Sequence, residues 1–460
     1  MNVLGPRVVI AGTHSGVGKT TVATGLMAAL ASRGVRVASA KVGPDFIDPG
    51  YHSLATGRPG RNLDAWMCGV EAIGPLAGRA AHGCDVLIVE GVMGLFDGAG
   101  DGTPSSTADL AKLIDAPVVL VVDAASMSQS VAAIVHGFAT LDPSVKLAGI
   151  ILNRVGSAGH EVLLRDALVP LGLPVLGVIG RDEAFSWRDR HLGLVPVAER
   201  PHTVKASIAL LVAAINRSCD LDAVMALAGT AVTRTVAEPN VSSSPAGRAR
   251  VALAAGPAFS FTYPDNLDAL TAAGAELVPF DPCVDAGLPP GCTALIAGGG
   301  FPEVFAGALA DNTALLDDVR RRVTDGLVVW AECGGLLWLA TSLDGRPMAG
   351  VVDAGAVMTK RLTLGYRAAR TLVETPLGPV GTLLRGHEFH YSTTDPTGDA
   401  LHVRGRHGEG TTGFASPSML ASYLHVHLGN APEVAEAFVV RSAPPYRRTS
   451  APSSAQKVAN

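Results

Sequence analysis

Short apolar runs, rich in β-branched residues, alternate with helical patterns along the first half of the chain. The runs cover residues 8–11, 35–42, 86–89, 118–122, 147–152 and 175–179. They are almost continuously hydrophobic, as is typical of parallel strands covered on both faces. The segments between them, such as 22–32 and 131–141, place apolar residues at helical spacing. This alternation predicts a doubly wound α/β domain around a parallel sheet.

The same alternation returns in the second half after a break. Helical patterning continues through 204–228, whereas residues 235–249 lose it and contain mainly Ser, Pro and Ala, so we interpret them as a linker. Apolar runs recur at 250–255, 276–280, 294–297 and 327–331, and residues 351–413 have the turn signals of antiparallel strands. We therefore expect domains at 1–234 and 250–445, followed by a disordered tail at 446–460.

Composition and charge limit the classes of function. The chain has 460 residues, of which 48% are hydrophobic and 17% charged, with a net charge of −5. This charge gives no electrostatic reason to expect a nucleic acid or an anionic membrane as partner. We expect a cytoplasmic protein, because no apolar stretch approaches the ~20 residues of a membrane span and the first residues lack a signal-peptide pattern. The six cysteines form no CxxC pair, which predicts mostly buried thiols.

A glycine-rich loop, GTHSGVGKTT at 12–21, follows the first strand and runs into a helix. Backbone N–H groups and the helix dipole can bind a triphosphate there, with Lys19 at the β- and γ-phosphates and the Thr20 hydroxyl at Mg²⁺. Thr13 stands where the strict pattern has glycine, so the loop is a variant. A glycine-rich turn without a ligand is the weaker alternative. The residues expected to bind nucleotide are Ser15, Gly16, Val17, Gly18, Lys19, Thr20 and Thr21.

Two segments with acidic residues leave the next strands, KVGPDFIDP at 41–49 and EGVMGLFDG at 90–98. Carboxylates at the carboxyl ends of parallel strands face the crevice where ligands bind. Beside a triphosphate they are suited to hold Mg²⁺. Any one of them could instead cap a helix or form a turn, and for Asp45 the two interpretations are equal. For the four acids together the structural interpretation is poor.

The second half contains a candidate thiol nucleophile. The strand at 327–331 runs into ECGGL, and the glycines after Cys333 allow the strained turn of a nucleophile elbow at a helix N-terminus, which stabilises a thiolate. Upstream, GGGFPE at 298–303 could supply the N–H groups of an oxyanion hole. Downstream, His425 offers a general base. Each piece alone has an ordinary structural explanation, but together and in this order they indicate a triad-type glutaminase.

These residues resemble the cobyrinic acid a,c-diamide synthase family, the corrin-ring amidases of cobalamin biosynthesis. The resemblance runs from about residue 8 to residue 440. It rests on KVGPDFIDPGYH (41–52), NLDAWM (62–67), EGVMGLFDG (90–98), SSTADLAK (105–112), LNRVGS (152–157), RHLGLVP (190–196), GGFPE (299–303), AECGGL (331–336), LTLGYR (362–367) and GHEFHYS (386–392). The first half is similar to dethiobiotin synthetase and the second to class I glutamine amidotransferase domains.

The resemblance implies a ligase that uses ATP, Mg²⁺ and L-glutamine to amidate the a- and c-acetate carboxylates of a corrinoid through acyl phosphates. Residues 1–234 would be the synthetase and 250–445 the amidotransferase. It implies Cys333, His425, Asp48 and Asp97 as catalytic residues, Thr20, Asp48 and Glu90 as metal ligands, and Asn153 at the adenine. Candidates for the substrate site are Lys41, Asp45, Tyr366, Arg367, His387, His390 and Tyr391, with Arg361 beside them; for any one of the candidates in the β-rich segment, a solvated surface is nearly as good an explanation.

One departure leaves the group that orients His425 open. Class I domains carry His-x-Glu, whereas this chain has His427 at the third position. The glutaminase would be a dyad or would use another acid such as Glu388.

Other functions fit the sequence less well. A regulatory P-loop ATPase would leave Cys333 and His425 without a role, and such ATPases carry a second lysine where this loop has His14. A cobyric acid synthase-like amidase lacks the KVGPDFIDPGYH form, and a degenerate scaffold would have lost Lys19 or Cys333. The sequence leaves a homodimer open. It also leaves open whether the ring contains cobalt, although the high Gly, Ala, Val and Arg usage weakly favours a metal-free ring.

Overall fold

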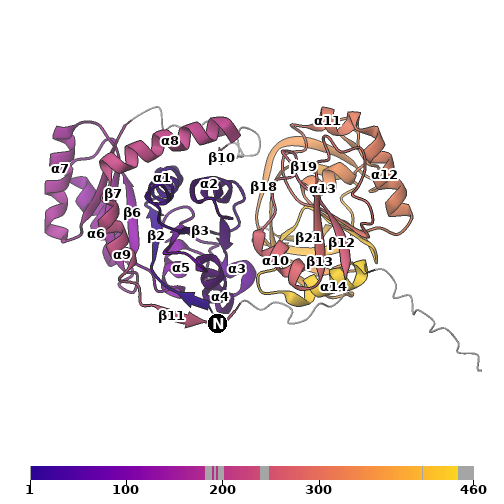
Figure 1. Ribbon diagram of the computed structural model, residues 1–460, viewed down its shortest axis with the longest axis horizontal. Coiled ribbons are helices and arrows are strands. Elements are labelled where there is room, and N and C mark those ends of the chain that lie inside the picture. Colours follow the sequence, from indigo (N-terminus) through magenta and orange to yellow (C-terminus); the bar gives the residue numbers. More distant parts are fainter. Residues whose placement is uncertain are drawn as a thin grey trace, which may run out of the picture.

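The computed structural model describes residues 2–181, 189–190, 193–194, 201–238, 248–406 and 408–443. Within them the chain forms two halves that lie side by side, each built around a mainly parallel sheet (Figure 1). Most of the RHLGLVP motif, most of the predicted linker and the whole predicted tail lie outside the described residues. No helix in the described ranges is long and apolar enough to cross a membrane.

The sheet of the first half is parallel throughout, in the order β4-β3-β5-β2-β6-β7-β8. Its strands are β2 (Arg7–Gly12), β3 (Val37–Val42), β4 (Arg61–Leu63), β5 (Val86–Glu90), β6 (Val118–Asp123), β7 (Leu147–Val155) and β8 (Val175–Gly180). The six strands predicted from apolar runs are confirmed. The edge strand β4 gave no such signal, because two of its three residues are polar.

Helices cover both faces of this sheet (Figure 1). They are α1 (Lys19–Ser32), α2 (Ile47–Thr56), α3 (Ala65–Cys68), α4 (Val70–Ala81), α5 (Thr107–Leu113), α6 (Ser130–Thr140), α7 (Ala158–Leu168), the short η1 (Val169–Leu171), α8 (Pro201–Ser218) and α9 (Leu221–Ala228). A small ladder joins β9 (Asp189–Arg190) to β10 (Gly193–Leu194). Apolar residues on each face of the sheet form a separate core cluster with the helices that cover it.

The two ends of the first half are tied together by a ladder that the sequence did not predict. β1 (Asn2–Leu4) pairs antiparallel with β11 (Arg234–Val236). Thr235 and Val236 therefore belong to a strand, which corrects the interpretation of 235–249 as uniformly unpatterned linker. The strand is too short for periodicity to reveal it, since pairing rather than local pattern defines it.

The second half has its own sheet, in the order β13-β12-β14-β15-β23-β22, parallel except for β22. Its strands are β12 (Ala249–Ala254), β13 (Ala275–Phe280), β14 (Ala294–Ala297), β15 (Val328–Glu332), β22 (Phe414–Ser416) and β23 (Met419–Ser422). Its helices are α10 (Pro264–Ala272), α11 (Ala306–Asp311), α12 (Thr313–Thr324), α13 (Gly334–Leu339) and α14 (Pro432–Ser442).

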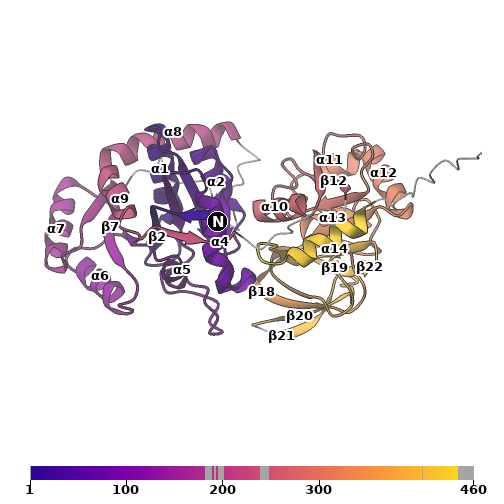
Figure 2. The ribbon, with the colours of Figure 1, turned by 60° about the horizontal axis from the view of Figure 1, so that its bottom comes forward.

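The predicted antiparallel strands form a further sheet in the second half. It contains β16 (Ser342–Leu343), β17 (Arg346–Pro347), β18 (Gly355–Thr371), β19 (Leu383–Asp395), β20 (Leu401–Gly405), β21 (Gly408–Thr412) and β24 (His425–Val426). The long hairpin of β18 and β19 carries several of the substrate candidates. In Figure 2, β18, β20 and β21 lie on the side of this half that faces the first half.

The two halves share part of their core. Tyr263 belongs to the apolar cluster on one face of the first sheet, and Phe261 and Phe301 belong to the cluster on the other face. The Arg61 guanidinium pairs across the interface with Asp265 at 2.6 Å and Asp268 at 2.8 Å. Tyr263 donates its hydroxyl hydrogen bond to the carbonyl of Pro44 at 2.9 Å. These contacts place the end of β3 directly against the second half.

Candidate active site

The phosphate loop connects β2 to α1 and has the shape that its glycines predict. Gly18 caps α1 with a φ of 95°, a left-handed conformation that favours glycine. Lys19 is buried and its ammonium donates to the carbonyl of His14 at 3.0 Å. Burial, together with the nearby charge of Lys41, lowers the pKa of Lys19 to about 8. Ser15 and Gly16 are exposed, Val17 is buried, and Thr20 and Thr21 are half-buried.

Two side chains at the end of β7 hold the loop in place. The Asn153 amide donates to the carbonyl of Val17 at 2.9 Å, and it fills the space that a Cβ on Gly18 would occupy. The Arg154 guanidinium donates to the carbonyl of Gly16 at 2.9 Å and pairs with Asp123. Asn153 therefore supports the loop directly. Arg154 was not a candidate, although it lies in the same LNRVGS motif.

Two carboxylates and three cationic or polar groups meet at the carboxyl ends of β3 and β5, and we call them the acid cluster. The Lys41 ammonium lies 2.7 Å from Asp48 and 2.8 Å from Glu90. The Thr20 hydroxyl donates to Glu90 at 2.6 Å and lies 3.3 Å from Asp48. His52, which was not a candidate, contacts the other oxygen of Glu90 at 2.6 Å. Asp48 is on the first turn of α2, so that helix positions it over the phosphate loop.

Burial and pairing push the pKa values of the two acids in opposite directions. Burial and the negative charges of Asp45 and Glu90 raise the pKa of Asp48 well above its usual value. Burial would also raise the pKa of Glu90, but Lys41 and His52 outweigh it and hold that pKa below its usual range. Glu90 is therefore the fixed anion of the cluster, while Asp48 has the carboxyl group that gains most from an additional cation.

The oxygen atoms of Thr20, Asp48 and Glu90 form a set that suits Mg²⁺, which prefers oxygen ligands and shares them with phosphates and water. Within the described ranges no group of three His, Cys, Asp or Glu side chains is arranged to hold a metal ion by itself. A Mg²⁺ ion at this point would take its remaining ligands from phosphate oxygens and water.

The other two acids make local contacts with the backbone. An oxygen of Asp45 accepts the N–H of Ile47 at 2.6 Å, at the start of α2. Asp97 is exposed, and its carboxylate accepts the N–H of Gly94 at 2.8 Å. The structure thus groups Asp48 with Glu90 and leaves Asp97 on the turn that follows β5, where its negative charge still acts on Lys19.

The candidate nucleophile lies at a strained corner between β15 and α13. Cys333 has a φ of 47° and a ψ of −98°, a conformation that is costly for a residue with a side chain. The next turn packs tightly, since a Cβ on Gly335 would lie 2.1 Å from the carbonyl oxygen of Ala297. Gly299 donates its N–H to Phe261 at 3.2 Å, and the nitrogen of Gly300 lies beside the elbow, 3.1 Å from a Cβ built on Gly334.

His425, on β24, is brought to this corner and is buried there. Its Nδ1 lies 3.5 Å from an oxygen of Glu332, and the imidazole interacts electrostatically with the Cys333 side chain. Burial lowers the pKa of His425, but its interactions with Cys333 and Glu332 outweigh this effect and raise that pKa to about 10. Glu388, the acid considered from the sequence, instead pairs with Arg367 at 2.7 Å. The acid beside His425 is therefore Glu332, which precedes the nucleophile.

The substrate candidates of the β18–β19 hairpin do not form one surface. Tyr366 donates to Asp64 at 2.8 Å and stacks on Trp66 with ring centroids 4.6 Å apart, so it belongs to the interface. His387 is buried and stacks on His425 at 4.9 Å. His390 is buried against Tyr423 at 3.7 Å.

Arg367 is held by Glu388, as described above, Tyr391 is half-buried and Arg361 is exposed. Lys41, also a substrate candidate, lies in the acid cluster instead. Most of the candidates therefore divide between the acid cluster, the interface and the elbow, and Arg361 lies at the exposed surface.

Phe46 connects the two centres. It lies between Asp45 and Asp48 in the first half, and its ring centroid is 5.1 Å from that of His425. It also stacks on Tyr263 at 4.3 Å and on Phe261 at 5.2 Å. Phe46 stands within the KVGPDFIDPGYH motif, but its role cannot be read from the sequence, because a single aromatic residue beside acids has no distinctive pattern.

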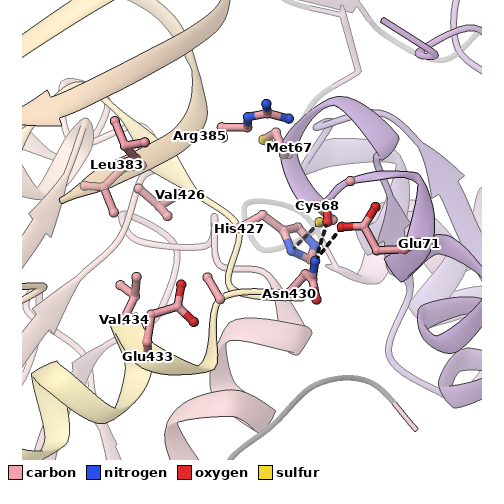
Figure 3. Close-up of a pocket in the computed structure, with 13 residues that line it drawn as sticks. Met67, Cys68, Glu71, Leu383, Arg385, Val426, His427, Asn430, Glu433 and Val434 are labelled. Carbon is pink, nitrogen blue, oxygen red and sulfur yellow. Dashed lines mark hydrogen bonds between the residues drawn. The ribbon is translucent and has the colours of Figure 1, made fainter. Parts of the chain in front are cut away.

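A pocket of about 310 Å³ lies elsewhere along the interface (Figure 3). His427 forms part of the wall of this pocket. The Nδ1 atom of His427 accepts the N–H of Gly429 at 3.0 Å and lies 3.2 Å from the sulfur of Cys68. Asn430 donates to the carbonyl of Cys68 and to Glu71, each at 3.0 Å. His427 therefore contacts the first half rather than orienting His425.

Comparison with known proteins agrees with this arrangement. Residues 8–195 match the CobQ/CobB/MinD/ParA nucleotide binding domain, and residues 250–433 match the CobB/CobQ-like glutamine amidotransferase domain. The hydrogenobyrinate a,c-diamide synthase of Streptomyces coelicolor is 49% identical over 95% of this chain and 97% of its own length. The chain belongs to the a,c-diamide synthase family.

Two other members of the family are similar over the same span. The hydrogenobyrinate a,c-diamide synthase of Mycobacterium bovis is 45% identical over 95% of this chain and 98% of its own. The cobyrinate a,c-diamide synthase of Syntrophotalea carbinolica is 42% identical over 94% of this chain and 98% of its own length. Family membership confirms the predicted fold class, a nucleotide-binding α/β domain followed by a glutamine amidotransferase domain. It also confirms the enzyme class, a carbon–nitrogen ligase with glutamine as nitrogen donor.

Proposed function

We propose that the protein converts hydrogenobyrinate into its a,c-diamide, with ATP activating each acetate carboxylate and glutamine supplying the nitrogen. The observation that carries the proposal is that Phe46 links the acid cluster of the first half to the Cys333–His425 centre of the second half. Phe46 touches His425 with its ring, and the helix that begins after it carries Asp48 of the acid cluster. We assign synthesis to residues 1–234 and glutamine hydrolysis to residues 250–445.

The choice of ring rests on the relatives. Those from Streptomyces coelicolor and Mycobacterium bovis are named for hydrogenobyrinate, the ring without cobalt, and are 49% and 45% identical. The relative from Syntrophotalea carbinolica is named for cobyrinate and is 42% identical. This order supports the metal-free ring as the natural substrate.

Glutamine hydrolysis uses the elbow. The Cys333 thiolate attacks the side-chain amide carbon of glutamine, and His425 gives a proton to the departing nitrogen, which leaves as ammonia. The neutral His425 then takes a proton from water, which attacks the thioester and releases glutamate. The raised pKa of His425 suits this order, because the proton is on the imidazole before the amide bond breaks.

Amide synthesis uses the acid cluster and the phosphate loop. A substrate carboxylate oxygen attacks the γ-phosphorus of ATP, which gives an acyl phosphate and ADP. Ammonia then attacks the acyl carbon, and phosphate leaves. Lys19 and the loop N–H groups hold the negative charge of the transferred phosphoryl group. Thr20, Asp48 and Glu90 would hold Mg²⁺, which neutralises phosphate oxygens when bound.

Purified protein incubated with ATP, glutamine and each of the two rings tests this proposal. Mass spectrometry should find two carboxylates replaced by amides, with the metal-free ring converted at the higher kcat/KM. Higher kcat/KM with the cobalt ring would overturn the choice of substrate. Failure to amidate either ring, in the presence of measurable ATP binding, would overturn the proposed function itself.

A further inference from the structure

Glu332 contacts β24, the strand that carries His425, at two points. It is the last residue of β15, immediately before Cys333, and its side chain is buried. One carboxylate oxygen accepts the N–H of Val426 at 3.0 Å, and the other lies 3.5 Å from Nδ1 of His425. A single carboxylate therefore fixes the backbone of β24 and faces its imidazole.

The strained elbow explains how two successive residues reach the same imidazole. Successive side chains of a regular strand point to opposite faces of the sheet. The positive φ of Cys333 breaks this alternation, so that the carboxylate of Glu332 and the sulfur of Cys333 both contact His425. The strain at Cys333 thus serves the acid as well as the nucleophile.

Three other polar groups of the β18–β19 hairpin and the β24 segment make contacts of their own. Glu388 is paired with Arg367. His427 has its Nδ1 occupied by Gly429 and Cys68, and burial lowers its pKa, so it stays neutral. His387 stacks on the His425 ring and is likewise neutral, because burial lowers its pKa. Within the described ranges, Glu332 is the acid that the fold brings to Nδ1.

We propose that Glu332 is the positioning residue of the glutaminase centre and takes the place of the glutamate that class I domains carry two residues after the histidine. This inference rests on the proposed roles of Cys333 and His425. Its carboxylate holds the Nδ1 proton of His425, which leaves the other ring nitrogen for the thiol, and it stabilises the imidazolium that accompanies the thiolate. The 3.5 Å separation is long for a hydrogen bond, as is common before substrate binds.

The variant Glu332→Gln removes the negative charge of this side chain but keeps nearly the same size and shape. Glutamine keeps an oxygen that can accept the N–H of Val426, but it carries no negative charge for His425. We expect glutamine hydrolysis to lose about 10²-fold or more in kcat with KM little changed. Synthesis from ammonium should stay near normal, which shows that the protein is folded. Glu332→Asp should recover part of the loss.

A pH profile distinguishes positioning from general destabilisation. The pH dependence of kcat/KM for glutamine hydrolysis reports the protonated imidazole of His425, and its upper pH limit should move down by about one unit or more in Glu332→Gln. The exposed Glu276 of the same half provides the matched control, and Glu276→Gln should leave the profile unchanged. An unshifted profile with normal kcat in Glu332→Gln, or a shift produced by Glu388→Gln instead, would overturn the assignment.

The same measurements separate this inference from the proposed function. If Cys333→Ser retained glutamine hydrolysis, the glutaminase centre itself would be wrongly placed. If Cys333→Ser abolished hydrolysis while Glu332→Gln remained normal, only the role of Glu332 would fail.

Discussion

The ring of Phe46 lies 5.1 Å from the imidazole of His425, although the two residues belong to different halves of the chain. Phe46 leads into α2, whose first turn carries Asp48. A shift of that turn during phosphoryl transfer would therefore move Phe46 and change its contact with His425 of the glutaminase centre. The contact offers a physical route by which glutamine hydrolysis can depend on the state of the synthetase site.

Phe46→Leu should uncouple the two reactions. Leucine keeps apolar bulk but loses the aromatic contacts with Tyr263, Phe261 and His425, each worth about 0.5–1.5 kcal/mol for a well-formed pair. The ratio of glutamate released to amide formed should rise several-fold. Phe138→Leu, on α6 of the first half, is the control and should keep the normal ratio. An unchanged ratio in Phe46→Leu would show that coupling runs elsewhere.

Cys333→Ser should lower the rate of glutamine-dependent amidation by about 10³-fold or more, because the nucleophile of the glutaminase centre is lost. Activity with high ammonium should persist, since ammonia can reach the acyl phosphate without the thiol. Cys283→Ser changes a half-buried thiol of the same half and should behave as wild type. Loss of both nitrogen sources in Cys333→Ser would mean that the thiol is structural or that the halves are obligately coupled.

The three acids should fall into two groups. Asp48→Asn and Glu90→Gln each replace an anionic oxygen ligand beside Thr20 by a neutral amide, so both amidations should slow together, with partial rescue by added Mg²⁺. Asp97→Asn alters the turn after β5, and a displacement of about 1 Å there could cost ~10²-fold at the second amidation while monoamide still accumulates. Time courses of mono- and diamide at low and high Mg²⁺ distinguish these cases. Identical time courses for all three variants would refute the grouping.

Lys19 should give ATP binding a characteristic pH dependence. Its lowered pKa of about 8 means that the free protein loses this cation as pH rises through that value. The apparent KM for ATP should then rise, approaching about tenfold per pH unit, while kcat changes less because bound triphosphate restores the proton. Lys19→Ala should lack synthesis with either nitrogen source but still hydrolyse glutamine. A KM for ATP that stays constant up to about pH 9 would contradict contact between Lys19 and the phosphates.

The sequence predicted what is encoded locally. Apolar runs identified the buried strands, and the glycines around Lys19 and Cys333 identified the turns that need unusual backbone angles. The ladder between β1 and β11 escaped, because the pairing of two three-residue strands depends on partners more than two hundred positions apart.

The candidate site was predictable in its chemistry but not in its groupings. Asp48 and Asp97 look equivalent in sequence, yet α2 turns the first toward Lys41 while the second remains exposed on its turn. No sequence pattern marked Glu332 as part of the site. A carboxylate at the end of β15 meets His425 only when the fold places β24 beside it. The same holds for Phe46, whose neighbours come from the other half.

The contact between Cys68 and His427 makes the two halves of this chain depend on each other's side chains. An ordinary class I domain would bring a glutamate to the position of His427. Burial, together with the negative charges of Asp64 and Asp265, already raises the pKa of Cys68 well above its usual value. Another carboxylate would add negative charge where solvent cannot screen it. A chimera that joins this first half to an ordinary class I domain should therefore be less stable at the interface than the native pair of halves.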